Sequence, residues 1–96
     1  MTGRRLRMSA DTAEFIRTLH PEIKRKIKAS LETILKDANS GKGLRDELEG
    51  LRSFRVGKMR IVCRPAQNSK IIEVAAVGPR RTIYEETLRL LRRGRK

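Results

Sequence analysis

The chain has 96 residues, of which 24 are Lys or Arg and 11 are Asp or Glu, so its formal net charge is +13. Aromatic residues make up 3% of the sequence, too few for a stacking platform on single-stranded nucleic acid, and the lone Cys63 excludes an internal disulfide. Because we find no apolar run of membrane-spanning length, no signal peptide and no Cys/His cluster, we expect one domain over residues 1–96, in the cytoplasm, without membrane, metal or cofactor.

The first half of the chain predicts a short strand followed by a helical hairpin. Residues 4–8, RRLRM, suggest the strand, and Ser9 or Asp11 is suited to cap a helix that ends at His20-Pro21. A second helix is predicted over residues 21–38 and ends at Asn39-Ser40-Gly41. Apolar residues recur at helical spacing at Ala13, Phe15, Ile16 and Leu19, and then at Ile23, Ile27, Leu31, Ile34 and Leu35. We therefore expect two antiparallel helices that share an apolar seam.

The second half predicts a loop, three strands and a short helix. The loop GKGLRDELEG has Leu44, Leu48 and Leu51 as possible anchors, and strands follow at about residues 51–56, 59–65 and 70–77. The last strand, KIIEVAAV, is apolar on both sides, which is typical of a central strand. Gly78-Pro79 ends it, RRTIYEETLRLLRR predicts a helix, and residues 92–96 form a flexible basic tail. The order β-α-α-β-β-β-α indicates an α+β fold with segregated helices.

The stretch SFRVGKMRIV has the pattern of a β-hairpin. A two-residue turn at Gly57-Lys58 places Arg55 opposite Arg60. Since side chains alternate between faces, one face carries Phe54, Val56, Met59, Ile61 and Cys63, and the other carries Leu51, Ser53, Arg55, Arg60, Val62 and Arg64. The first set predicts a core face, with Cys63 buried and inert, and the second predicts a cationic face on which three arginines converge. Opposed arginines destabilise a sheet by a few tenths to about 1 kcal/mol, which solvent, the carboxylate of Glu73, the acidic cluster at 46–49 or a bound phosphate could offset.

A second cationic feature follows the last strand. Arg80 and Arg81 precede the predicted third helix, where they and free backbone N–H groups would form an anion pocket. Residues 51–96 hold 13 Lys or Arg against 3 Asp or Glu, whereas residues 1–50 hold 11 against 8. This imbalance indicates a polyanionic partner, either nucleic acid or an acidic protein, although a soluble basic surface would look the same.

SFRVGKMRIV followed by EVAAVGPRRTIYEE resembles the RelE/ParE superfamily of toxins of type II toxin–antitoxin systems. The family pattern is an R-x-G-x-Y-R-like hairpin, then a strand that ends in a V-G-H-R-like corner before a helix carrying tyrosine. The resemblance covers nearly the whole chain, because the order of elements also fits. It implies a RelE-like (microbial-ribonuclease-like) fold and, for RelE-like members, cleavage of messenger RNA on the ribosome.

The resemblance also implies roles for individual residues. Arg60 matches the hairpin arginine and Arg80 the corner arginine, both of which stabilise phosphate, and Tyr84 matches the tyrosine that can orient or activate the nucleophile. We take Arg60, Arg80 and Tyr84 as the catalytic candidates. The candidates for binding RNA phosphates are Arg55, Lys58, Arg64 and Arg81.

The sequence departs from the family pattern where proton transfer is concerned. Met59 stands where the hairpin tyrosine is usual, Pro79 where the corner often has histidine or lysine, and Ser53 where a second strand lysine would help. Because arginine does not lose its proton in the working pH range, Tyr84 and Lys58 are the nearby groups that could exchange one. Three functions therefore stay open: an endoribonuclease, a ParE-type non-catalytic inhibitor of DNA gyrase, and a catalytically decayed basic binding module.

All three functions share a partner, because such toxins are neutralised by a cognate antitoxin. The charge of +13 predicts an acidic binding segment and salt-dependent association. The groove of the helical hairpin is the expected dock for its apolar anchors.

Overall fold

The structure, a computed structural model, describes residues 5–37, 41–65 and 70–94. Its elements in chain order are β1 (Arg5–Met8), α1 (Ala10–Arg17), α2 (Pro21–Lys36), β2 (Lys42–Gly43), a 3-10 turn (Asp46–Leu48), β3 (Arg52–Val56), β4 (Met59–Pro65), β5 (Ile71–Pro79) and α3 (Ile83–Gly94). The expected α+β architecture is confirmed, with one strand, β2, added between the helices and the hairpin. None of the helices in the described ranges is both long and apolar enough to cross a membrane.

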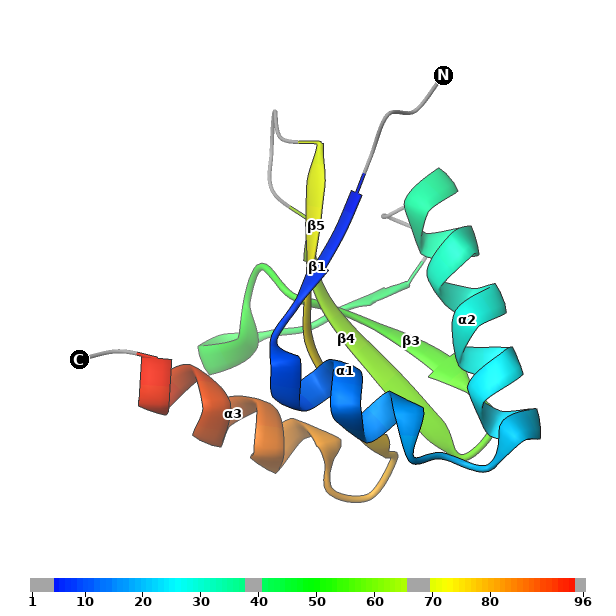
Figure 1. The fold of residues 1–96 in the computed structure, drawn as a ribbon. Coiled ribbons are helices and arrows are strands. Elements are labelled where there is room, and N and C mark those ends of the chain that lie inside the picture. Colours follow the sequence, from blue (N-terminus) through cyan, green and yellow to red (C-terminus); the bar gives the residue numbers. More distant parts are fainter. Residues whose placement is uncertain (1–4, 38–40, 66–69, 95–96) are drawn as a thin grey trace.

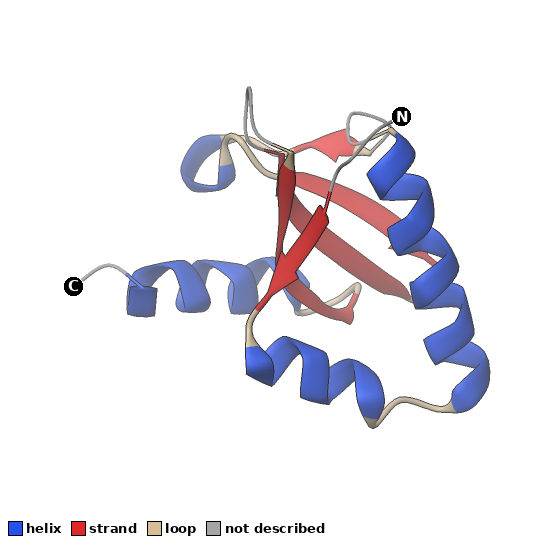
Figure 2. Cartoon of the chain, turned by 45° about the horizontal axis from the view of Figure 1, so that its top comes forward, coloured by secondary structure: helices blue, strands red, loops and turns tan. Residues whose placement is uncertain are grey.

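The strands of the described residues form one five-stranded sheet at the centre of the molecule (Figure 1). Its strand order is β1-β5-β4-β3-β2, in which β1 runs parallel to β5 and the other neighbours are antiparallel. The apolar strand β5 lies inside the sheet, as its composition predicts. Figures 1 and 2 show α2 and α3 on opposite sides of this sheet, so each face is covered by helix.

Two apolar cores result, one on each face of the sheet. The larger core joins α1 and α2 to the sheet through Ile16, Ile27, Leu31, Ile34, Phe54, Val56, Ile61, Cys63, Ile72, Val74 and Val77. The smaller core lies beneath α3 and consists of Leu51, Val62, Ala76 and Ile83, with Leu44, Leu48 and Tyr84 packed at its edge. The three leucines that we expected to anchor the 41–50 loop therefore do so, but against α3's face of the sheet.

A β-bulge in β5 lets this strand serve both cores. Val62 lies opposite Ala76, whereas the next residue of β4, Cys63, lies opposite Val74, so Ala75 is the extra residue. Val74 and Val77 consequently both face the larger core, while Ala76 faces the smaller one. Strict alternation along β5 would have placed Val74 and Val77 on opposite faces.

The two N-terminal helices begin where the sequence predicts. Ser9 caps α1, since its Oγ accepts a hydrogen bond of 3.1 Å from the Thr12 N–H, which decides between the two expected caps. His20 caps α2 in the same way, as its Nδ1 accepts a bond of 3.2 Å from the Glu22 N–H, and Pro21 is the first helical residue. The only histidine of the chain thus stabilises a helix start.

The two helices do not share the seam that we expected. Figure 2 shows α1 and α2 splayed at a steep angle, each lying against the sheet. Phe15 and Ile23, both predicted to face inward, are 38% and 37% exposed. The reason is that the apolar face of each helix packs against the sheet rather than against the other helix, so residues at the edge of that face remain exposed to solvent.

Several predicted boundaries also shift. The 41–50 segment contains β2, which pairs with β3, and β5 continues through Gly78 and Pro79, which lie opposite Arg60 and Met59. Proline is tolerated at that strand end because it lacks only an N–H group. Helix α3 continues to Gly94, so the expected tail at 92–96 is helical over its first part and its last two residues lie outside the described range. The helix stop at Asn39-Ser40, the loop at 66–69 and residue 4 of the first strand also lie outside it.

Candidate functional site

The β3–β4 hairpin has the predicted register. Arg55 lies opposite Arg60 and Val56 opposite Met59, with the turn at Gly57-Lys58. Gly57 has φ of +61°, a conformation that glycine adopts without strain, as the first position of a type II′ turn requires. The core face of the hairpin is also as predicted, because Phe54, Val56, Ile61 and Cys63 belong to the larger core.

The side chains of the opposed residues Arg55 and Arg60 extend in different directions, which separates their charges. Arg55 Nε donates to the Gly57 carbonyl at 3.5 Å, so its side chain leads toward the turn. Arg60 Nη1 donates to Ser53 Oγ at 3.1 Å, so its side chain leads back along β3. Of the carboxylates that we expected to offset the repulsion, Glu73 lies opposite Arg64 on the sheet and Glu47, in the 46–49 cluster, pairs with Arg92 at 3.3 Å. The like-charge repulsion is therefore reduced by geometry.

Ser53 connects the hairpin to α3. Its side chain is 2% exposed, and its Oγ accepts hydrogen bonds from Arg60 Nη1 at 3.1 Å and from Tyr84 Oη at 3.3 Å. The strand ladder holds its backbone on both sides, opposite Lys42 of β2 and Val62 of β4. We call Ser53, Arg60 and Tyr84 the Ser53 cluster. The family resemblance implies that these residues share one site, but no pattern in the sequence indicates that Ser53 Oγ is hydrogen-bonded to both of the others.

Helix α3 reaches this cluster because its first turns are anchored on the sheet. Ile83 and Thr87 are both fully buried, and Ile83 belongs to the smaller core. Thr87 satisfies its hydroxyl by donating to the Ile83 carbonyl at 2.7 Å. Since Tyr84 follows Ile83 directly, this packing sets the position of the phenol.

A cationic pocket lies at the hairpin turn, and one of its lining residues, Arg55, lies opposite Arg60 of the Ser53 cluster. It has a volume of about 430 Å³ and is lined by Arg55, Gly57, Lys58, Pro79, Arg80 and Arg81. The Arg80 N–H donates to the Lys58 carbonyl at 2.9 Å and thereby joins the corner after β5 to the hairpin turn. Four basic side chains from two distant segments consequently surround one pocket, an arrangement that favours an anion. We call it the turn pocket.

The backbone contributes fewer free N–H groups to the turn pocket than the sequence predicts. We expected free N–H groups at the start of α3, but the Arg80 N–H is bonded to Lys58, and the Thr82 N–H donates to the Pro79 carbonyl at 3.2 Å. Positive charge in the pocket therefore comes chiefly from side chains.

A second pocket adjoins the other side of Arg55 and Arg60. It also has a volume of about 430 Å³ and lies between α2 and the β2–β3 edge, where it is lined by Ser30, Thr33, Ile34, Gly41, Lys42, Ser53, Phe54, Arg55 and Arg60. Arg55 thus borders both pockets, whereas Arg60 borders only the second one.

Arg64 lies apart from the other predicted phosphate-binding residues. It follows Arg60 by four residues on the same strand, a separation of about 13 Å at the usual strand rise. It is exposed and lies opposite Glu73, and it lines neither of the two pockets described above. Of the three arginines that we expected to converge, Arg55 and Arg60 line a common pocket and Arg64 does not.

The other side chains that could be reactive, Cys63 among them, show no catalytic or metal-binding arrangement in the described residues. Cys63 is fully buried in the larger core, and this burial raises the pKa of its thiol from 9.0 to about 12. Such a thiol is a poor nucleophile, as predicted. Within residues 5–37, 41–65 and 70–94, no group of three or more His, Cys, Asp or Glu side chains is placed to hold a metal ion.

A comparison with protein families identifies the class to which the chain belongs. The family described as "ParE toxin of type II toxin-antitoxin system, parDE" matches residues 6–84, which is most of the chain. The chain therefore belongs to the RelE/ParE family of toxins of type II toxin–antitoxin systems. No curated protein matched the chain in a sequence comparison.

Solved structures of similar fold come from the same group of toxins. A mutant of E. coli toxin RelE in the free state superposes with a TM-score of 0.75 at 13% identity, covering 97% of this chain and 98% of that one. The toxin–antitoxin complex RelBE2 from Mycobacterium tuberculosis gives 0.69 at 23% identity, covering 80% and 98%. The archaeal RelE–RelB complex from Pyrococcus horikoshii OT3 gives 0.67 at 16% identity, covering 83% and 97%. At these identities the likeness demonstrates the RelE-like fold.

Proposed function

We propose that this toxin is a ribosome-dependent endoribonuclease that cleaves messenger RNA in the cytoplasm and so inhibits translation. The observation that carries the proposal is the Ser53 cluster, in which a phenol and a guanidinium are hydrogen-bonded to one buried hydroxyl on the hairpin that also forms the cationic turn pocket. A site of this kind combines a group able to transfer a proton with cations able to hold phosphate.

The chemistry of RNA cleavage matches these components. The 2′-hydroxyl attacks the adjacent phosphate, and the phosphorane that forms carries additional negative charge. In the proposed site Arg60 and Arg80 stabilise that charge, while Arg55, Lys58 and Arg81 bind phosphates of the same strand in the turn pocket. Tyr84 is the catalytic group that exchanges a proton, because arginine keeps its own. The ribosome would supply the orientation of the message.

Mapping of message ends by primer extension tests the proposal. Expression without antitoxin should produce cuts within translated messages, and Arg60→Ala or Arg80→Ala should reduce cutting by on the order of 100-fold or more, since each removes a charge that stabilises the transition state. Arg7→Ala is the matched control, because Arg7 is an exposed arginine of β1 at the opposite edge of the sheet. Arg64→Ala should behave like this control if the site is confined to the turn end. Growth arrest with intact messages would contradict the proposal.

A ParE-type inhibitor of DNA gyrase is the second candidate. Two observations favour it: the matching family is described by ParE, and Met59 and Pro79 stand where a proton-transferring side chain would help a ribonuclease. A supercoiling assay with purified toxin separates the two activities, because a gyrase inhibitor blocks supercoiling without any message cleavage. A decayed binding module would do neither and would leave growth unaffected when it is expressed alone.

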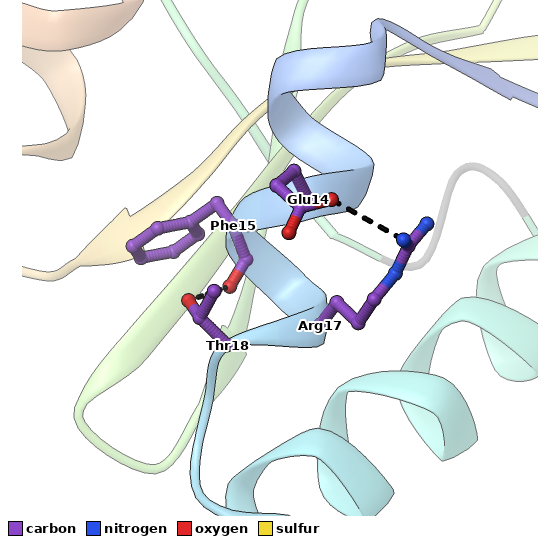
Figure 3. A network of polar contacts seen from close by, with 4 residues as sticks. All are labelled: Glu14, Phe15, Arg17 and Thr18. Carbon is purple, nitrogen blue, oxygen red and sulfur yellow. Dashed lines mark hydrogen bonds and ion pairs between the residues drawn. The ribbon is translucent and has the colours of Figure 1, made fainter.

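We also propose a cognate antitoxin as the binding partner, in keeping with similar structures that are toxin–antitoxin complexes. The charge of +13 favours an acidic segment and an affinity that falls as salt increases. Exposed Phe15 offers apolar surface to such a segment. Figure 3 shows its ring on the side of α1 away from Arg17, whose guanidinium pairs with Glu14 at 3.2 Å.

A further inference from the structure

The hydrogen bonds around Ser53 are constrained by what each partner can donate. A guanidinium has N–H donors and no acceptor, so Ser53 Oγ must accept the bond from Arg60 Nη1. A serine hydroxyl and a tyrosine phenol, in contrast, can each donate or accept. The contact of 3.3 Å between Ser53 Oγ and Tyr84 Oη can therefore run in either direction, while the bond from Arg60 stays in place.

Reversal of this one bond changes what Tyr84 can do. When Tyr84 donates to Ser53, its proton points into the protein. When Ser53 donates to Tyr84, the phenol's proton is free for an acceptor outside, and its oxygen remains hydrogen-bonded. Ser53 is suited to this exchange because it is 2% exposed and its backbone is paired with strands on both sides, which limits the access of water and fixes the strand that carries the hydroxyl.

We propose that Ser53 is a positioning residue through which Tyr84 delivers its proton to the leaving 5′-oxygen of the cleaved RNA; this rests on the proposed function. A phenol is an O–H donor at neutral pH, which is the state that a general acid needs. After the transfer, the phenolate oxygen accepts a hydrogen bond from Ser53, whose hydroxyl is polarised by the Arg60 guanidinium. Serine at this position thus supports the acid, where a lysine would add charge.

The step balances in atoms and protons. The bond from the 2′-oxygen to phosphorus forms and the bond from phosphorus to the 5′-oxygen breaks, which leaves a 2′,3′-cyclic phosphate and a 5′-hydroxyl. The 5′-oxygen receives its proton from Tyr84, the proton of the 2′-hydroxyl passes to water, and water then returns a proton to the phenolate.

A double-mutant cycle on purified toxin with programmed ribosomes tests the proposal. Tyr84→Phe should lower kcat on the order of 100-fold, the usual scale for loss of a general acid. Ser53→Ala should lower kcat on the order of tenfold with little change in KM, and Ser53→Thr, which restores a hydroxyl, should recover most of it. Added to Tyr84→Phe, Ser53→Ala should have no further effect. Independent, multiplying effects of the two substitutions would overturn the proposal, as would a Ser53→Ala variant that changes KM alone.

A spectroscopic comparison keeps the inference separate from the proposed activity. Tyr84 is the chain's single tyrosine and tryptophan is absent, so tyrosine signals in the near-ultraviolet circular dichroism spectrum report on this ring alone. Ser53→Ala should weaken that band while the far-ultraviolet spectrum is retained, and Ser53→Thr should keep it. An unchanged band in Ser53→Ala would show that Ser53 does not hold the phenol. A wild-type toxin that cuts no message would overturn the proposed function and the proton step with it, whatever the spectrum shows.

Discussion

Replacement of Ile83 by alanine should reveal how the small core beneath α3 positions the site. Ile83 is fully buried between α3 and the sheet, next to Leu51 and Val62, and it directly precedes Tyr84. Buried Ile-to-Ala changes destabilise proteins by about 2–5 kcal/mol, depending on how far the cavity collapses. Because α3 packs on one side only and can settle toward the sheet, we expect about 3 kcal/mol. At roughly 4–8 °C per kcal/mol for a domain of this size, the midpoint of thermal unfolding should fall by roughly 12–24 °C.

Thermal and urea unfolding followed by circular dichroism measure this effect. The control is Leu90→Ala on the same helix, whose side chain is 41% exposed and whose loss should change stability by no more than about 0.5 kcal/mol. Message cleavage by Ile83→Ala should also fall at temperatures where the variant is folded, because the phenol loses its support. If Ile83→Ala unfolds no earlier than Leu90→Ala, the smaller core does not hold α3 and the reasoning is refuted.

Two further outcomes follow from local geometry. Gly41→Ala should destabilise the fold by about 1–3 kcal/mol in urea, because a Cβ would lie 2.7 Å from a backbone oxygen of β3, whereas Gly43→Ala, with 3.5 Å to its nearest atom, should be close to neutral. Burial raises the pKa of the Cys63 thiol from 9.0 to about 12, so the unfolded thiol ionises first and the stabilisation, complete below pH 9, is lost as the pH rises toward 12. Between pH 8 and pH 10 the wild type should therefore lose about 1.4 kcal/mol more stability than Cys63→Ala, and equal losses would contradict the assigned burial.

Much of the fold could be predicted from the sequence because the relevant signals are local. Alternation on either side of Gly57-Lys58 predicts the hairpin and the pairing of Arg55 with Arg60, and the structure has that register. Helical spacing likewise predicts α2, and the capping chemistry of Ser9 and His20-Pro21 marks where two helices begin. Each of these features depends on residues a few positions apart.

The predictions were wrong where a residue's neighbours come from another helix or strand. The prediction of an apolar seam between α1 and α2 was wrong because each helix packs on the sheet. Phe15 and Ile23 are therefore left exposed at the edge of the apolar face of their helices. The bulge at Ala75 also has no sequence signature, yet it turns Val74 and Val77 toward the same core. Helical and strand periodicity state which face of an element is apolar, but not what will cover it.

The candidate site shows the same difference between features set by local sequence and features set by contacts between elements. The sequence by itself determined its cationic residues, Arg55, Arg60 and Arg80, because the hairpin and the corner are short motifs with a definite spacing. Only the tertiary structure decided that Ser53, which stands where the family resemblance implies a lysine, bonds both to Arg60, seven positions away, and to Tyr84, 31 positions away. The physical reason is that this contact depends on how α3 packs over the smaller core, and packing is a property of the whole fold and not of any one segment.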